Sequence, residues 1–248
     1  MKTAAFIIAR LNSSRLPEKN LMPILGKPMI EHLIHRVRKS KLIDETCIVT
    51  SNLESDDKLE EFAKVNNIPC YRGSLDNIME RIIGAANYFG SESIVEILGD
   101  NPLVHSELID DVVDLFNKTD SDYAANLTKE YPQFNRKQIG FPVGIRVQIY
   151  KKEVAEKYLS FPEYINSDKH PTSFIFENTD KYNVSFIEPI DKWDYLNHPD
   201  LHFAVNLEKN FRLINIIFEE LYKHDSNFDF RDIIEMVNKN KDLLTLMG

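Results

Sequence analysis

Apolar residues recur with two different spacings along the first half of the chain. Short apolar runs such as 4–9 are typical of buried strands, whereas 29–37 places its apolar residues at the spacing of a helix. The sequence predicts strands at 4–9, 46–50, 68–71, 93–98 and 123–126, and helices at 29–37, 56–65, 77–88 and 108–116. Because strands alternate with helices, we expect an α/β fold with a mostly parallel sheet and helices on both of its faces.

The pattern changes after residue 127. Residues 143–150 alternate between apolar and polar, which predicts a strand with Arg146 and Gln148 on its polar face. Further strands are predicted at 183–187 and 202–205, and helices at 152–158, 170–177, 208–222 and 230–238. We interpret the chain as one domain, 1–248, which consists of a first half (1–127), a smaller inserted lobe (128–200) and a closing strand with C-terminal helices (201–248).

Composition narrows the classes of protein that fit this pattern. Hydrophobic residues make up 43% of the 248 positions and charged residues 28%, which indicates a globular chain with a sizeable core. The net charge of −9 disfavours a nucleic-acid partner, because binding a long polyanion requires a broad basic face.

The first apolar run and the two cysteines bear on the compartment. The run 4–9 ends at Arg10 and is shorter than the about 7–15 apolar residues of a signal sequence. No run approaches the ~18 apolar residues of a membrane-spanning helix. Cys47 and Cys70 match no metal spacing and cannot form a disulfide framework. We therefore expect a cytoplasmic protein with reduced cysteines and no membrane insertion.

The loop after the first strand carries the most informative cluster of side chains. Ligands of parallel sheets bind outside the carboxyl ends of the strands, where this loop lies. Cations and small polar residues alternate in it: Arg10, Asn12, Ser13, Ser14, Arg15 and Lys19. Together with exposed backbone N–H groups they predict a cradle for a polyphosphate, and the alternative is a solvated loop with scattered basic residues. It is not a Walker A loop, because no glycine lies between Thr3 and Leu25.

A single acidic residue, Asp100, stands at the end of the predicted strand 93–98. Mg²⁺ is commonly bound by one or two carboxylates together with phosphate oxygens and waters, so Asp100 fits a metal ligand. The alternative is an Asx turn before Pro102, in which the carboxylate accepts hydrogen bonds from its own loop.

Two motifs taken together resemble the opening of the cytidylyltransferase family. They are I-I-A-R-x-x-S-S-R-L-P-x-K at 7–19 and G-K-P-M-I at 26–30, and weaker matches follow in the family's order at 71–74, 99–103, 141–144 and 169–175. The family includes CMP-ketodeoxyoctonate and CMP-acylneuraminate synthetases, and the chain is most similar to the spore-coat polysaccharide cytidylyltransferase-like branch. The resemblance implies a Rossmann-like sheet of the nucleotide-diphospho-sugar transferase type, with the nucleotide in the first half of the chain.

The resemblance also implies which residues bind the substrates. Nucleotide binding would involve Ala9, Arg10, Asn12, Ser13, Ser14, Arg15, Lys19, Ser51, Arg72, Ser74, Asn77 and Arg81, of which the last four lie on the base and sugar side. Arg15 and Lys19 would stabilise the leaving pyrophosphate, and Asp100 would hold Mg²⁺ as the cofactor. Acceptor binding would involve Asn101, Asn126, Arg146, Gln148 and His170.

Three positions depart from the family's pattern. Asn206 stands where the family's second metal-binding aspartate is expected, and its neutral amide oxygen is a weaker ligand for a divalent cation. Arg146 and Gln148 stand where spore-coat-like members usually carry acids. A guanidinium at position 146 is suited to pairing with a carboxylate of the acceptor.

Three functions are compatible with these features. The first is a Mg²⁺-dependent cytidylyltransferase that moves CMP from CTP to a sugar acid or related acceptor for surface polysaccharide or glycan synthesis, and the family resemblance adds a homodimer as an expectation. The second is a glycosyltransferase that uses a nucleotide sugar, although Asp100-Asn101-Pro102 is a poor D-x-D motif. The third is a nucleotide-binding protein that has lost catalysis, which Asn206 favours and the intact opening loop opposes.

Overall fold

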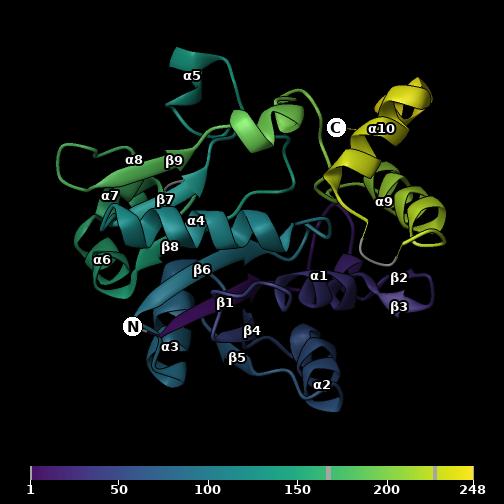
Figure 1. Ribbon diagram of the computed structural model, residues 1–248. Helices are drawn as coiled ribbons and strands as arrows, with labels where there is room; N and C mark the ends of the chain where they lie inside the picture. Colours follow the sequence, from purple (N-terminus) through teal and green to yellow (C-terminus); the bar gives the residue numbers. More distant parts are fainter. Residues whose placement is uncertain (1, 166–168, 226–227, 248) are drawn as a thin grey trace.

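A seven-stranded sheet forms the centre of the computed structural model, which describes residues 2–165, 169–225 and 228–247 (Figure 1). Its strands are β1 (Thr3–Ile8), β4 (Glu45–Ser51), β5 (Cys70–Gly73), β6 (Ser93–Leu98), β7 (Tyr123–Asn126), β8 (Gln148–Lys151) and β9 (Val184–Ile187). They lie in the order β5-β4-β1-β6-β8-β7-β9, and all neighbours are parallel except where β8 pairs with β6 and β7. The predicted mostly parallel sheet is confirmed.

The longer helices lie where the apolar spacing predicts them, with ends that differ by at most two residues. They are α1 (Met29–Val37), α2 (Asp57–Val65), α3 (Ile78–Phe89), α4 (Ser106–Lys118), α9 (Glu208–Leu221) and α10 (Phe230–Lys239). Helix α1 shows why the apolar spacing predicts the helices correctly. Met29, Leu33 and Val37 recur at helical spacing and are all buried, whereas His35 between them is exposed.

Each face of the sheet is covered by helices and has its own apolar core (Figure 1). Successive residues of a strand point to opposite faces. In β1, Ala5 and Ile7 therefore join the core that contains α1, α4, α9 and α10. Ala4 and Phe6 join the core that contains α3, α6 (Lys152–Glu156) and α8 (Ser173–Phe176).

The central pair of strands positions the site. Strands β1 and β6 run side by side in parallel with Ile8 opposite Leu98, so the loops that follow these two residues meet at one edge of the sheet.

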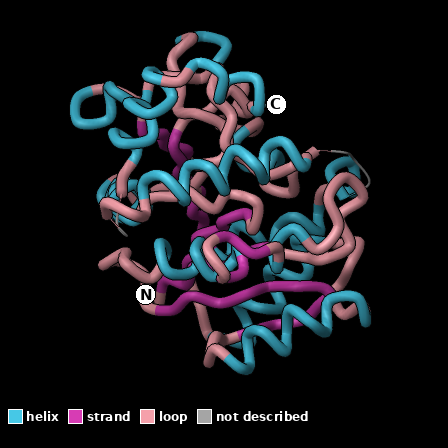
Figure 2. The backbone as a smooth tube through the Cα atoms, turned by 90° about the vertical axis from the view of Figure 1, so that its right-hand side faces the viewer, coloured by secondary structure: helices cyan, strands magenta, loops and turns pink. Residues whose placement is uncertain are grey.

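Helices α9 and α10 pack near the C-terminal end, which lies far from the N-terminal end in both views (Figures 1 and 2). Within the described chain, no helix has the length and apolar character needed to cross a membrane.

The predicted strand at 143–150 is wrong over its first half. Gly144 adopts a φ of 96° and turns the chain, so the pairing of β8 begins only at Gln148. Val143 instead exchanges backbone hydrogen bonds with Leu201 (3.0 Å) and Phe203 (2.7 Å). The strand predicted at 202–205 is therefore wrong as well, because that segment makes an isolated bridge rather than a ladder.

Two helices predicted in the inserted lobe are shorter than expected. Helix α6 ends at Glu156 and continues as a 3₁₀ turn over Lys157–Ser160. The helix predicted from His170 begins only at Ser173. The imidazole Nδ1 of His170 lies 2.8 Å from the hydroxyl of Thr172, and such local side-chain bonds compete with helix formation.

Some elements are too short for their period to be read from the sequence. They are the strands β2 (Pro23–Ile24) and β3 (Lys27–Pro28), which pair with each other, and the helices α5 (Phe134–Lys137) and α7 (Pro162–Ile165). Strands β8 and β9 fall within 128–200 and yet pair in the main sheet. The division into 1–127, 128–200 and 201–248 stays a prediction.

Candidate active site

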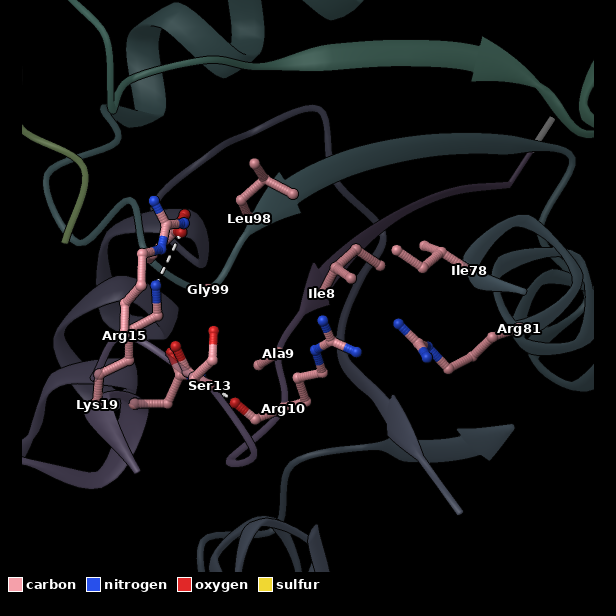
Figure 3. A pocket seen from close by; sticks show the side chains of 13 residues that line it. Ile8, Ala9, Arg10, Ser13, Arg15, Lys19, Ile78, Arg81, Leu98 and Gly99 are labelled. Carbon is pink, nitrogen blue, oxygen red and sulfur yellow. Dashed lines mark hydrogen bonds and ion pairs between the residues drawn. The ribbon is translucent and has the colours of Figure 1, made fainter. Parts of the chain in front are cut away.

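A cavity of about 280 Å³ opens at the carboxyl ends of β1 and β6 (Figure 3). Its lining is rich in cations and polar groups: Ile8, Ala9, Arg10, Ser13, Ser14, Arg15, Lys19, Asn20, Ile78, Arg81, Leu98, Gly99 and Asp100. The structure thus brings together Ala9, Arg10, Ser13, Ser14, Arg15, Lys19, Arg81 and Asp100 from the expected site residues. The cavity lies where ligands of parallel sheets commonly bind.

The opening loop is fastened to the sheet by Asp56, a residue that the sequence patterns do not single out. Its buried carboxylate accepts hydrogen bonds from the backbone N–H groups of Leu11 (2.7 Å) and Ser51 (3.2 Å), and from the Ser51 hydroxyl. Ser51 therefore acts on the loop through Asp56 and is absent from the cavity lining. Asn20 adds a second tie, because its Nδ2 donates to the carbonyl of Arg10 (3.1 Å).

The guanidinium groups of Arg10 and Arg81 point toward each other across one end of the cavity (Figure 3). Arg81 is only 2% exposed, and its Nη1 donates to the carbonyl of Ser74 (2.6 Å). Its Nε has no hydrogen-bond partner among the described residues. Burial and the charge of Arg10 lower the pKa of Arg81. Two facing cations with an unused donor suit an anion bound between them.

Lys19 lies at the other end of the cavity (Figure 3). It forms an ion pair with Asp100, in which Nζ is 3.0 Å from Oδ2. The same ammonium donates to the carbonyl of Val205 (2.6 Å). The backbone N–H of Val205 in turn donates to the carbonyl of Asp100 (2.9 Å). The second carboxylate oxygen of Asp100 is buried and has no hydrogen-bond partner in the described part of the chain.

Arg15 reaches across to the segment that precedes α9, where its Nη2 donates to the amide oxygen of Asn206 (2.9 Å). Asn206 and Asp100 thus both lie beside the cations of the opening loop. Asn206 is absent from the cavity lining, whereas Asp100 lies in it and keeps one carboxylate oxygen without a partner among the described residues, an oxygen of the type that Mg²⁺ binds. The described residues contain no group of three or more His, Cys, Asp or Glu that could hold a metal by itself.

Arg72 is committed to other partners. Its Nε and Nη2 donate to the carbonyls of Ser51 (3.0 Å) and Leu53 (2.7 Å). Its Nη1 lies 2.6 Å from a carboxylate oxygen of Asp57 and 2.7 Å from one of Glu60. The side chain therefore ties β5 to the start of α2 and is absent from the cavity lining.

Three further residues expected at the nucleotide site are also absent from the cavity lining. Asn77 caps α3 by accepting a hydrogen bond from the backbone N–H of Glu80 (2.9 Å). The Ser74 hydroxyl accepts one from the backbone N–H of Asn77 (3.1 Å). Asn12 is exposed on the opening loop. Ser74 and Asn77 shape the turn that presents Arg81.

A second cavity, of about 510 Å³, adjoins the first and shares Leu98 with it. It is lined by Leu98, Lys129, Glu130, Tyr131, Pro132, Asn135, Arg146, Lys169, His170, Ser173, Phe176 and Glu177. Arg146 and His170, both expected to bind the acceptor, lie in this lining. Leu98 is the last residue of β6, so both cavities reach the end of this strand.

Arg146 is the deepest cation of the second cavity and is 6% exposed. The nearest carboxylate is that of Glu130, 3.6 Å away, which is too far for a direct hydrogen bond. Burial lowers the pKa of Arg146, but Tyr131, Glu130, Tyr123 and Glu96 together raise it by more, so the net shift is upward. The guanidinium keeps its charge and retains donors for an anionic ligand.

Glu96 supports this cavity from within the sheet, and the sequence analysis missed it. Its carboxylate accepts a hydrogen bond from the hydroxyl of Tyr150 (2.6 Å) and lies 3.1 Å from Nε2 of His170. Burial raises the pKa of Glu96, but His170 and Tyr150 lower it by more, so it falls below the usual value. The sequence did contain a signal for Glu96, since it is the one acid in the apolar strand Ser93–Leu98 and buried acids are rare without partners.

The remaining residues expected to bind the acceptor, Gln148, Asn126 and Asn101, are buried and absent from both cavity linings. Gln148 accepts hydrogen bonds from the hydroxyls of Tyr123 (2.6 Å) and Thr172 (3.1 Å). Asn126 accepts one from the backbone N–H of Val147 (2.7 Å). Their hydrogen bonds hold the start of β8 and the turn before α8, which carry Arg146 and His170.

A mostly parallel sheet with a cationic cavity beyond its central strands is typical of a protein that binds a phosphorylated ligand such as a nucleotide. The family model described as cytidylyltransferase matches residues 4–238. The chain therefore belongs to the cytidylyltransferase family, and it is a nucleotidyltransferase. The resemblance read from the opening motifs is confirmed.

Individual relatives match from about three fifths to nearly all of the chain. The spore coat polysaccharide biosynthesis protein SpsF of Bacillus subtilis is 25% identical over 99% of this chain and 98% of its own length. A 3-deoxy-manno-octulosonate cytidylyltransferase of Hydrogenovibrio crunogenus is 32% identical over 59% of this chain and 60% of its own length. The solved structure of a cytidylyltransferase from Leptospira borgpetersenii is 26% identical, covers 98% of this chain and 97% of its own, and superposes with a TM-score of 0.84.

Proposed function

We propose that the protein transfers CMP from CTP to a hydroxyl of an acidic sugar and releases pyrophosphate. The observation that carries this proposal is the pair of adjoining cavities, one lined by Arg10, Arg15, Lys19 and Arg81, the other by Arg146. The first cavity has the charge for a triphosphate and the second has a buried cation for a carboxylate. The name of the Hydrogenovibrio relative supports a sugar acid as the acceptor class.

The reaction needs positioning and charge stabilisation rather than a protein nucleophile. The oxygen of the acceptor hydroxyl attacks the α-phosphorus in line and its proton is lost to solvent. The bond from that phosphorus to the bridging oxygen breaks, and pyrophosphate leaves with the electron pair. Arg15 and Lys19 face the cavity from the opening loop and stabilise the charge that grows on the leaving group. The ties from Asp56 and Asn20 hold that loop in place before substrate binds, which reduces the ordering cost.

Asp100 and Asn206 are the residues that would hold Mg²⁺. When bound, the metal neutralises phosphate charge and orients the phosphoryl group. One carboxylate and one amide oxygen leave most of the coordination shell to phosphate oxygens and waters, which is common for this ion.

The acceptor's carboxylate is assigned to Arg146. Its nearest protein carboxylate, on Glu130, stands 3.6 Å away, so a bidentate ligand can gain hydrogen bonds that Glu130 does not make. His170 lies on the same wall and is oriented by Glu96 and Thr172. These two residues define the side of the cavity on which the acid group is held.

The test is detection of the product. The enzyme, CTP and Mg²⁺ are incubated with a panel of sugar acids and matched neutral sugars, and the new phosphodiester is followed by phosphorus NMR. A CMP-linked sugar acid supports the proposal. CTP binding by calorimetry with no product from any acceptor would favour the second candidate, a nucleotide-binding protein that has lost catalysis, for which Asn206 in place of an aspartate is the specific reason.

A further inference from the structure

Lys19 is paired with one of the two carboxylate oxygens of Asp100, the residue that would hold a metal. Its ammonium lies 3.0 Å from Oδ2, and the side chains of Lys19 and Asp100 are only 10% and 21% exposed. A charge pair so far removed from water is stronger than an exposed one, and separating it leaves a buried charge without a partner. The other carboxylate oxygen, Oδ1, has no partner among the described residues, but a cation bound there would lie beside the ammonium of Lys19, whose like charge opposes it.

The other charges of the cavity oppose a metal in the same way. Arg10, Arg15 and Arg81 line it together with Lys19, and Asp100 is its one carboxylate among the lining residues. A divalent cation that enters the empty cavity is repelled by the surplus positive charge. A polyphosphate reverses the sign of the local field and offers Lys19 alternative oxygen partners.

We propose that Lys19 and a divalent cation exclude each other at Asp100, so that metal binds this carboxylate only after Lys19 has moved onto the phosphates of a bound nucleotide. The inference rests on the proposed function for the identity of the nucleotide, but the exclusion itself does not. Lysine suits this exchange, because its ammonium is a compact charge on a flexible stem and can turn from one oxygen to another. The carbonyl of Val205, which Lys19 contacts at 2.6 Å, is freed in the same movement.

The exchange makes metal binding and nucleotide binding mutually dependent. By linkage, a nucleotide that draws Lys19 away raises the affinity for metal, and metal raises the affinity for nucleotide by the same factor. Asp100 is thereby kept neutralised in the free enzyme, which avoids a buried and unpaired carboxylate. Lys19 is a positioning residue in this step as well as a contact for the leaving group.

The experiment measures Mn²⁺ binding by electron paramagnetic resonance in the absence of any nucleotide. Lys19→Met and Lys19→Gln remove the ammonium but keep most of the stem. The matched control is Arg10→Met, which removes the same charge from the same cavity at a side chain that points toward Arg81 (Figure 3). The double variant Lys19→Met/Asp100→Asn tests whether any gained metal sits on Asp100.

Both Lys19 variants are expected to bind Mn²⁺ at least about tenfold more tightly than the wild type. Arg10→Met should gain less than about threefold in Mn²⁺ affinity, and the double variant should show no gain. Equal affinities of wild type and Lys19→Met, or an equal gain in Arg10→Met, would overturn the exclusion. A Kd below about 10 μM for Mn²⁺ and the wild type without nucleotide would also overturn it. This measurement does not depend on whether any variant folds correctly. A gain in the Lys19 variants with no turnover of any nucleotide would refute the proposed function and leave this inference standing.

Discussion

Arg15 donates a hydrogen bond from Nη2 to the amide oxygen of Asn206 across 2.9 Å, although the two residues are 191 positions apart in sequence. The contact joins the opening loop to the segment before α9. It also puts a neutral oxygen next to Val205, whose carbonyl binds Lys19 beside Asp100. Three segments that are distant in sequence thus meet at this end of the cavity, and Asp100 is the one carboxylate among the residues that line it.

Asn206→Asp is expected to tighten Mn²⁺ binding to the CTP complex by about tenfold, because a second carboxylate raises the charge of the donor set. With CTP bound, Arg15 has phosphate oxygens as alternative partners, so the new acid is available to the metal. Calorimetric titration of the CTP-saturated protein measures the change. Asn206→Ala, which lacks the oxygen, should weaken binding, and equal affinities in all three proteins would remove Asn206 from the metal site.

Arg146→Met is expected to lower kcat/KM for an acidic acceptor by about 10- to 100-fold, since hydrogen bonds to charged groups are worth about 1.5–3 kcal/mol. The loss should appear mainly in KM and should be small for a matched neutral sugar. Steady-state kinetics with the two acceptors separates these effects. An equal loss for both would mean that Arg146 supports the cavity wall and does not bind the acid.

Glu96→Gln is expected to destabilise the fold by about 1–3 kcal/mol near neutral pH, because it removes a buried carboxylate that accepts a hydrogen bond from Tyr150 and lies 3.1 Å from Nε2 of His170. The pKa of Glu96 is lower in the folded than in the unfolded chain, so its contribution is complete above the unfolded pKa and is lost as pH falls through the folded pKa. Urea unfolding should give a difference between wild type and variant that is largest above about pH 6 and shrinks below about pH 4.5.

The control for this pH dependence is Glu235→Gln on α10, where the carboxylate pairs with Lys239 on the surface. Its effect on the free energy of unfolding should be small at every pH, as is usual for exposed pairs. A difference for Glu96→Gln that stays constant down to about pH 3 would show that packing, not charge, explains its effect.

Gly144→Ala is expected to destabilise the fold by more than about 3 kcal/mol, because it combines backbone strain with a clash. The residue has a φ of 96°, and an added Cβ would lie 2.2 Å from the backbone nitrogen of Ala204. Gly90→Ala is the matched control, since Gly90 has a φ of 67° and nothing within 4 Å of an added Cβ. Urea unfolding should show a loss of only about 1 kcal/mol there. Equal losses would mean that the close approach at Ala204 relaxes.

Local patterns were sufficient for the sheet and for the cavity at its edge. The apolar run of β1 and the loop after it predict both the strand and the cation cluster, because the carboxyl ends of parallel strands meet. The pairing of Arg15 with Asn206 could not be predicted from such patterns, because it depends on how the segment before α9 packs against the opening loop. The strand expected at 143–150 failed because one glycine, Gly144, overrides an alternating pattern when it adopts a positive φ.

The roles of buried polar residues were predicted least well. Arg146 and Gln148 alternate correctly with their apolar neighbours, but both faces of that segment are buried, so alternation says nothing about which side chain meets a ligand. Arg146 lines a cavity, whereas Gln148 is enclosed by Tyr123 and Thr172. Asp56 and Glu96 position other residues, and this role can be recognised only from the partners that they contact in the structure.

The most direct measurement is pyrophosphate release from each of the four ribonucleoside triphosphates, with Mg²⁺ and the sugar-acid panel, in parallel for the wild type and Asp100→Ala. The account predicts release from CTP alone, dependent on one acidic acceptor and reduced at least about 100-fold in Asp100→Ala. Release from CTP that is unchanged in Asp100→Ala, or no binding of CTP at all, would contradict the assignment of the cavity between β1 and β6 as the catalytic site.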